Sequence, residues 1–244
     1  MKKLNRSSEL LWALGILFVA LGVSVCSKAD LGVSMIAAPA FIVHQFLSQW
    51  FGWLTVGVVE YVIQGIMLVL LCVIIGRFRW KYLLAFAVAV IYGYTLDLCM
   101  WLLGGFQVTA VWQRWITLIV GDIITAFGVA CFFRTYLPLQ VYELFVAELA
   151  HRFHLNINKT KGVYDIVLLV ISVLLAVFLF GDLATFDWSA ITKTSFHCIG
   201  LGTIVTTIIN APIITLMGRL IDRLFTNTPC FPKLASLLGN NGQQ

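Results

Sequence analysis

The sequence predicts an all-α integral membrane protein with about six transmembrane helices, arranged as two inverted three-helix repeats that each contain a short re-entrant or interfacial helix. Composition is the first observation behind this fold class. Hydrophobic residues make up 61% of the chain and charged residues 11%, whereas soluble domains carry about 25% charged residues. The mean hydropathy is +0.97. A set of long apolar runs and an internal repeat are the other two observations.

Six apolar runs are long enough to cross a bilayer. A hydrocarbon core of about 30 Å needs roughly 20 apolar residues in a helix, and a helix satisfies its own backbone hydrogen bonds inside lipid. In chain order the predicted spans are 10–26, 51–76, 82–103, 115–133, 162–180 and 197–217. We expect the first span to stay in the mature chain, because the sequence Ala-Asp-Leu that follows it is a poor cleavage site for a signal peptide.

The basic residues predict how these spans are oriented. Of the 16 Lys and Arg residues, Lys28, Arg114 and Lys193 fall on one side of a six-span topology, and the remaining thirteen fall on the other. Basic segments stay in the cytoplasm, so we expect both chain ends to be cytoplasmic. This bias also accounts for the net charge of +5, and no nucleic-acid partner is expected.

An internal repeat divides the chain. Residues 55–60, Thr-Val-Gly-Val-Val-Glu, return 105 positions later at 160–165 as Thr-Lys-Gly-Val-Tyr-Asp. Each copy opens a predicted span. With three spans in each repeat, the second copy must cross the membrane in the opposite sense. We therefore expect a first repeat at 1–110, a second at 111–225, and a short cytoplasmic tail at 226–244.

A short apolar segment follows the first span of each repeat. Residues 35–47 contain Pro39 and are too short to cross the bilayer. Residues 139–153 are amphipathic, with Gln140, Glu143 and His151 largely opposite the apolar face. In transporters with inverted repeats, the N-termini of short helices often bind the substrate. The alternative is that both segments are connecting helices at the membrane interface.

Four acids are predicted inside spans: Glu60, Asp97, Asp122 and Asp165. An ionisable group inside a span costs about 2.5–3.5 kcal/mol and usually serves a function. We expect no Lys or Arg at comparable depth, so these carboxyls would be protonated, hydrogen-bonded, or in contact with a cation or proton. Helix locking is the alternative for Glu60 and Asp122, and helix capping for Asp165. With polar neighbours and the residues before the short segments, the pathway candidates are Glu60, Gln64, Asp97, Asp122, Asp165, Asn210, Lys28, Asp30 and Arg134.

Several short motifs resemble a known family. They are residues 28–34 before the first short helix, Thr-x-Gly-Val at 55–58, Gly-Tyr-Thr-Leu-Asp-Leu at 93–98, Gly-Thr at 202–203 and Asn-Ala-Pro at 210–212. Over about residues 10–220 the chain is similar to the YczE/YitT-like bacterial membrane proteins. It departs from their pattern in having Val-Ser-Met at 33–35 in place of small-Pro-Trp. The resemblance implies a multi-pass protein of the bacterial inner membrane without an established general activity.

The sequence favours a small secondary transporter of a polar solute or ion, proton-coupled through Glu60 or Asp122. The alternative is a membrane accessory or scaffold protein that holds a partner enzyme. No enzyme activity is expected, because the chain has no G-x-S-x-G, H-E-x-x-H or P-loop motif. No cofactor or metal is expected either. The expected partners are the lipid bilayer and a small solute or ion, and the sequence leaves open a second copy of the chain or a partner membrane protein.

Overall fold

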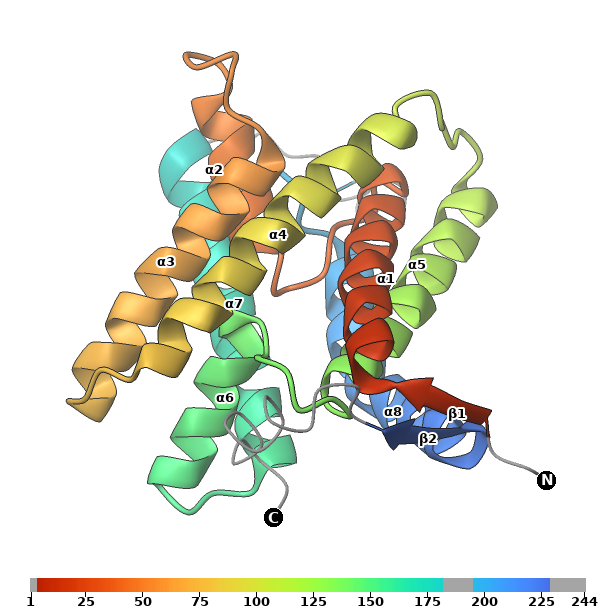
Figure 1. Cartoon of the computed structure of the whole chain (residues 1–244). Coiled ribbons are helices and arrows are strands. Elements are labelled where there is room, and N and C mark those ends of the chain that lie inside the picture. The colour runs from red at the N-terminus through yellow and green to blue at the C-terminus, as the bar shows by residue number, and fades with distance from the viewer. Residues whose placement is uncertain (1–3, 182–194, 229–244) are drawn as a thin grey trace.

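The computed structural model describes residues 4–181 and 195–228, and this part of the chain forms eight helices and one pair of short strands (Figure 1). In chain order the elements are β1 (Leu4–Ser7), α1 (Ser8–Lys28), α2 (Ala38–Leu47), α3 (Val56–Ile75), α4 (Trp80–Leu102), α5 (Val111–Phe132), α6 (Val141–Arg152), α7 (Ile157–Phe180), α8 (Leu201–Leu224) and β2 (Phe225–Thr228).

The predicted multi-span helical architecture is confirmed. Six helices, α1, α3, α4, α5, α7 and α8, are long and apolar enough to cross a membrane. The two shorter helices, α2 and α6, occupy the two predicted short segments. The strands β1 and β2 were not predicted, and they pair in parallel beside the first and last helices. The expected tail lies outside the described residues from position 229 onward.

Helix α7 begins at Ile157, five residues before the predicted span. The side chain of Asn156 explains this start, because its Oδ1 accepts a hydrogen bond from the backbone N–H of Lys159 at 3.4 Å. Such a bond satisfies one of the free N–H groups of a helix N-terminus. The first turn therefore belongs to the helix, although most of its residues are polar.

The long helices α1 and α5 pack against each other through their backbones. A Cβ atom on Gly22 of α1 would lie 2.6 Å from the carbonyl oxygen of Gly121 on α5. At the other end of the crossing, a Cβ on Gly128 of α5 would lie 2.8 Å from the carbonyl oxygen of Gly15 on α1. Any side chain at Gly22 or Gly128 would push the two helices apart.

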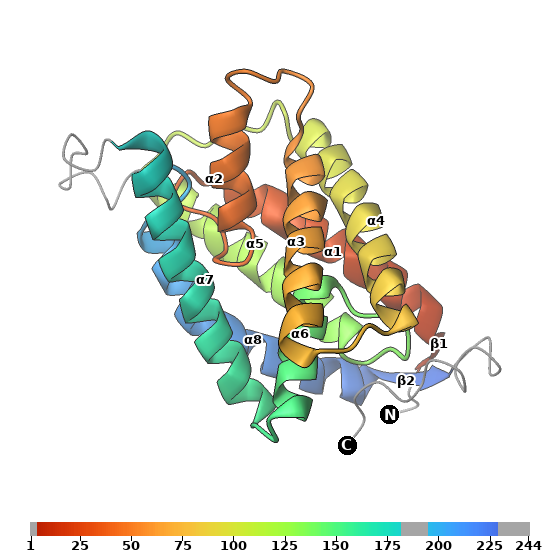
Figure 2. The same cartoon turned by 90° about the vertical axis from the view of Figure 1, so that its left-hand side faces the viewer.

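The remaining elements are arranged around this pair (Figures 1 and 2). Helix α4 packs on α1, and α8 packs on α5. Helix α3 lies along α4, α2 packs on α7, and α6 packs on α3. One apolar cluster joins α1, α2, α4 and α5, and a second joins α3, α4, α6 and α7.

The two ends of the helical body differ in charge. The α3–α4 turn, the segments on either side of α6 and the end of α8 lie at one end, in the lower part of Figure 1. We call this the basic end, because it carries Arg77, Arg79, Lys81, Arg134, Arg152, Lys159, Arg219 and Arg223. The loops between α2 and α3 and between α4 and α5 lie at the opposite end.

We expect Gly22→Val to destabilise the fold by about 1–3 kcal/mol, since overpacking at a close contact forces the helices apart. The measurement is the thermal unfolding midpoint of the purified protein in detergent. Gly105→Val is the control, because a Cβ there meets nothing within 4 Å. Equal midpoints for the two variants would show that the α1–α5 contact does not limit stability.

Candidate functional site

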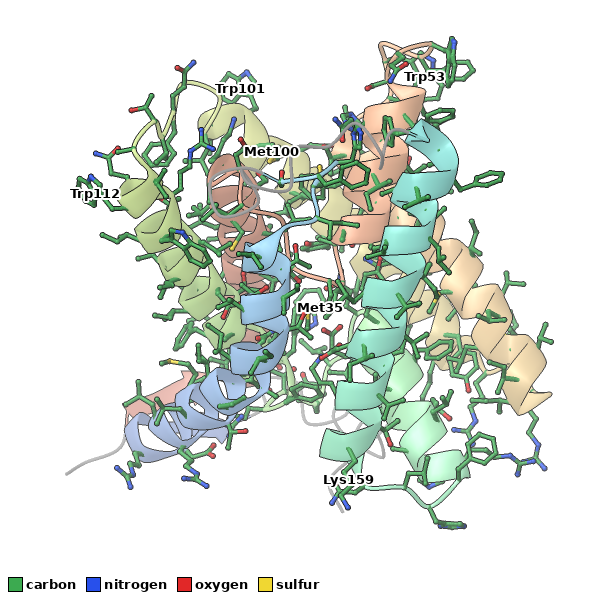
Figure 3. All side chains as sticks on the ribbon, turned by 180° about the vertical axis from the view of Figure 1, so that it is seen from behind. Met35, Trp53, Met100, Trp101, Trp112 and Lys159 are labelled. Atoms are coloured by element: carbon green, nitrogen blue, oxygen red, sulfur yellow. The ribbon has the colours of Figure 1, made fainter. Side chains whose placement is uncertain are left out.

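Buried polar side chains from four helices meet inside the molecule. We call this group the central cluster, and it consists of Glu60 on α3, Glu143 on α6, Lys161 and Asp165 on α7, and Asn210 on α8. The carboxyl and amide members are buried, with exposed fractions of 1% for Glu60, 5% for Glu143, 3% for Asp165 and 3% for Asn210. Figure 3 looks into this region between α7 and α8, where Met35 is labelled.

A small cavity of about 30 Å³ lies within the cluster. Glu60, Glu143, Lys161 and Asn210 line it, together with Tyr142. Since one water molecule needs roughly 10–15 Å³ of such volume, the cavity holds a few small atoms at most. It is large enough for an ion or a proton-carrying water.

Both short helices direct their N-termini at this cavity. Ser34 and Ala37 line it just before α2, and Gln140 lines it just before α6. A helix N-terminus presents N–H groups and a partial positive charge. At α2 the N–H groups of the first turn already donate to the carbonyl oxygens of Ser34 and Ala37, so α2 contributes only its dipole. The cavity is therefore bordered by carboxylates, one lysine and two helix N-termini, so it combines groups of both signs.

The cluster is only partly paired. Gln64 Nε2 donates to Glu60 Oε1 at 3.4 Å, and Lys161 Nζ lies 3.6 Å from Asp165 Oδ1. Glu143 Oε2 and Asn210 Oδ1 have no hydrogen-bond partner among the described residues, and the Tyr142 hydroxyl lies beside the Glu60 carboxyl. Buried polar atoms are nearly always paired, so two unsatisfied oxygens on one cavity indicate a site for a proton, water or solute.

Burial shifts the pKa of two neighbouring groups on α6. Burial raises the pKa of Glu143 above its ordinary value, the nearby Lys161 partly offsets this, and Asp165 adds to it. Burial and then the Glu60 carboxylate raise the pKa of the Tyr142 hydroxyl well above its usual range. Tyr142 therefore stays a neutral donor, whereas Glu143 takes up a proton more readily than an exposed carboxyl does.

The other predicted pathway residues lie apart from the cluster. Asp122 is buried on α5, and Asp97 is held by residues at the start of α3. Asp30 pairs with Arg114 at 3.0 Å at the opposite end, where Lys28 and Asp30 line a hollow of about 330 Å³. Arg134 pairs with Asp222 at the basic end.

Residues 6–219 match a family model described as a family of unknown function, DUF6198. The chain belongs to this family. Comparison with curated proteins and with solved structures gave no match. The family description names no activity, so the chemistry of this DUF6198 member has to be inferred from its geometry.

Two expectations about the acids need correction. The expectation that no Lys or Arg lies at comparable depth was wrong, because Lys161 is largely buried and forms an ion pair with Asp165. The early start of α7 places Lys161 in the second turn, facing the interior. Asp165 lies in the third turn, so it does not cap the helix.

Sequence reasoning missed three members of this site as functional candidates, namely Glu143, Tyr142 and Lys161. Signals were present for two of them. Glu143 was assigned to the polar face of the second short helix, and Lys161 lies within the second copy of the internal repeat. The sequence did not indicate that Glu143 turns inward, because this depends on how α6 packs against α3 and α7.

We expect Lys161→Met to destabilise the protein by about 3–5 kcal/mol, since it leaves the Asp165 carboxylate buried without its partner. Lys161→Met combined with Asp165→Asn should recover most of this loss, because the second change removes the unpaired charge. Thermal unfolding in detergent at pH 8 measures both. Lys159→Met, two residues earlier at an exposed position of α7, is the control. A single variant as stable as the wild type would contradict the role of this ion pair.

Proposed function

We propose that this protein is a small secondary transporter that moves a small polar solute or ion, coupled to protons, by alternating access. The central cluster supports this proposal more than any other observation. Carboxyls from two helices, one lysine and the N-termini of α2 and α6 border a small cavity and leave polar atoms unpaired. Asp165, on a third helix, pairs with the lysine. Transporters bind solutes and coupling ions at interior sites of this kind.

The proposal includes the inverted repeat. Gly121 and Gly128 lie 106 positions after Gly15 and Gly22. The repeat therefore maps the contact between Gly15 and Gly128 onto the contact between Gly121 and Gly22, and both contacts are present. The packing of α2 on α7 likewise has its counterpart in the packing of α6 on α3. These pairings support a two-fold axis in the membrane plane that passes through the α1–α5 crossing.

In this proposal the inverted repeat supplies the mechanism. One conformation opens the cavity toward one side of the membrane, and exchange of the two repeat conformations opens it toward the other. Glu60 and Asp165 occupy corresponding positions of the repeat, 105 residues apart. Protonation of the cluster would remove negative charge from the cavity and so couple solute release to proton binding.

The basic end is proposed to face the cytoplasm, because basic segments are retained on that side. The similarity to the YczE/YitT-like proteins supports a bacterial inner membrane and covers nearly the same residues as the family match, about 10–220 against 6–219. A non-transporting accessory protein for a partner enzyme is the competing function.

Metabolite profiling of deletion and overexpression cells would identify the solute, and uptake into proteoliposomes would test the site. Glu60→Gln and Glu143→Gln should keep folded protein in the membrane but flatten the pH dependence of uptake, because each removes a titratable carboxyl. Glu148→Gln, on the same helix as Glu143 and paired with Arg79 at the surface, should leave the pH profile unchanged.

Two results would contradict the proposal. Uptake with the wild-type pH dependence in both cluster variants would assign these carboxyls to helix packing. If no solute accumulates or is depleted in cells, and none moves in proteoliposomes with folded wild-type protein, the accessory function is favoured instead.

A further inference from the structure

Two matching sets of four residues lie at the two ends of the molecule. Each set combines Thr-x-Gly in the first two turns of one helix with Gly-x-x-x-Asp near the end of the next long helix. Thr55 is the N-cap of α3, whereas Thr160 is the fourth residue of α7. The Thr-x-Gly parts are 105 positions apart and the Gly-x-x-x-Asp parts are 125 positions apart. We call them the opposite-end set, with Thr55, Gly57, Gly93 and Asp97 on α3 and α4, and the basic-end set, with Thr160, Gly162, Gly218 and Asp222 on α7 and α8.

The opposite-end set is closed. Thr55 Oγ1 donates to Asp97 Oδ2 at 2.6 Å, and the backbone N–H of Gly57 donates to Asp97 Oδ1 at 2.8 Å. The backbones of Gly57 and Gly93 touch, so that a Cβ on Gly57 would overlap the carbonyl oxygen of Gly93. One carboxylate and a contact between two glycines therefore hold α3 against α4.

The basic-end set is open, and its threonine is bound within α7. Thr160 Oγ1 donates to the carbonyl oxygen of Asn156 at 3.0 Å. A Cβ on Gly162 would meet nothing within 4 Å. Asp222 instead binds Arg134 through hydrogen bonds of 2.6 and 2.7 Å, and the Arg134 guanidinium covers Gly218. Helices α7 and α8 lie apart toward the basic end (Figure 3). Lys159, at the basic end of α7, is labelled in Figure 3 and lies well away from α8.

We propose that the two sets are alternating latches, so that Asp222 binds Thr160 and Gly162 in a second conformation in which Asp97 has released Thr55 and Gly57. In that conformation the first turn of α7 has unwound and α7 begins after Thr160, as α3 begins after Thr55. This inference rests on the proposed alternating-access function and identifies the contacts that exchange. The conformation described here has the opposite-end latch closed and the basic-end latch open. In a transporter with inverted repeats, exchanging the conformations of the two repeats converts such a conformation into one that is open to the other side.

Arg134 holds the open latch in this proposal. Its ion pair with Asp222 removes the carboxylate from α7, so the basic end stays open while the pair persists. The residue 106 positions earlier is Lys28, at the end of α1 and in the hollow at the opposite end. In the second conformation Lys28 takes the corresponding role and binds the released Asp97.

The latches need glycine for the same reason at both ends. A carboxylate on one helix reaches a backbone N–H on the other only if the two backbones approach without side chains between them. Gly57 and Gly93 already meet this requirement in a contact. In the present conformation no neighbouring atom requires glycine at position 162. In this proposal glycine is required there only when the basic-end latch is closed.

Distances between spin labels test the exchange without any solute. One label pair replaces Lys159 and Arg219 at the basic end, and the other replaces Trp53 and Trp101 at the opposite end, all at exposed positions. Asp97→Ala should lengthen the opposite-end distance and shorten the basic-end distance. Asp30→Ala, which breaks a surface ion pair at the same end, is the control and should change neither distance.

A second variant separates the latch from a general loosening of the fold. Gly162→Val adds a side chain where the present conformation has free space, but it blocks the closed basic-end latch. Asp97→Ala combined with Gly162→Val should therefore keep the long basic-end distance of the wild type. Hydrogen exchange of residues 159–165 and 218–223 reports the same change in protein that keeps its native cysteines.

The proposal is overturned if Asp97→Ala leaves the basic-end distance and the hydrogen exchange unchanged. It is also overturned if Gly162→Val fails to block the shortening. Reciprocal distance changes in a protein that moves no solute would preserve the latches and reject the transporter. Transport without reciprocal changes would reject the latches alone.

Discussion

The close approach of α1 and α5 is the constraint on which the rest of the structure depends. Lipid tails are as apolar as the helix surfaces, so helices in a membrane associate mainly through close packing, and small residues allow it. Gly22 and Gly128 let the two backbones touch. Helices α4 and α8 then pack against this pair, and the mobile parts of a transport cycle would have a fixed centre around which to move.

Burying the carboxyls of the central cluster lowers the stability of the fold, and helix packing alone does not explain why they are present. Carboxyls at membrane depth are retained where protein groups, water or a ligand compensate them, and here Lys161 and the N-termini of α2 and α6 do so incompletely. An apolar core would be the simpler way to hold four helices together. The proposed solute site, reached from alternate sides of the membrane, would account both for the partly paired cluster and for the difference between the two ends.

Composition and run length were sufficient to predict the six spans and the two short helices, because burial in lipid leaves few alternatives to a helix. Residue-level detail was harder. The start of α7 depended on the side chain of Asn156 rather than on hydropathy, and this moved Lys161 to the interior. The inward turn of Glu143 depended on the packing of α6. The Gly-x-x-x-Asp motifs of α4 and α8 fall outside the 105-residue repeat, because the longer α7–α8 connection changes the offset to 125.

Proton movement through the purified protein tests the central claim most directly. Proteoliposomes that enclose a pH-sensitive dye would be given a small-solute extract of the cells under an imposed pH gradient. The account predicts solute-dependent proton flux with wild-type protein and its loss in Glu60→Gln at equal reconstitution. Folded wild-type protein that passes no protons with any fraction of the extract, or a Glu60→Gln variant with undiminished flux, would contradict it.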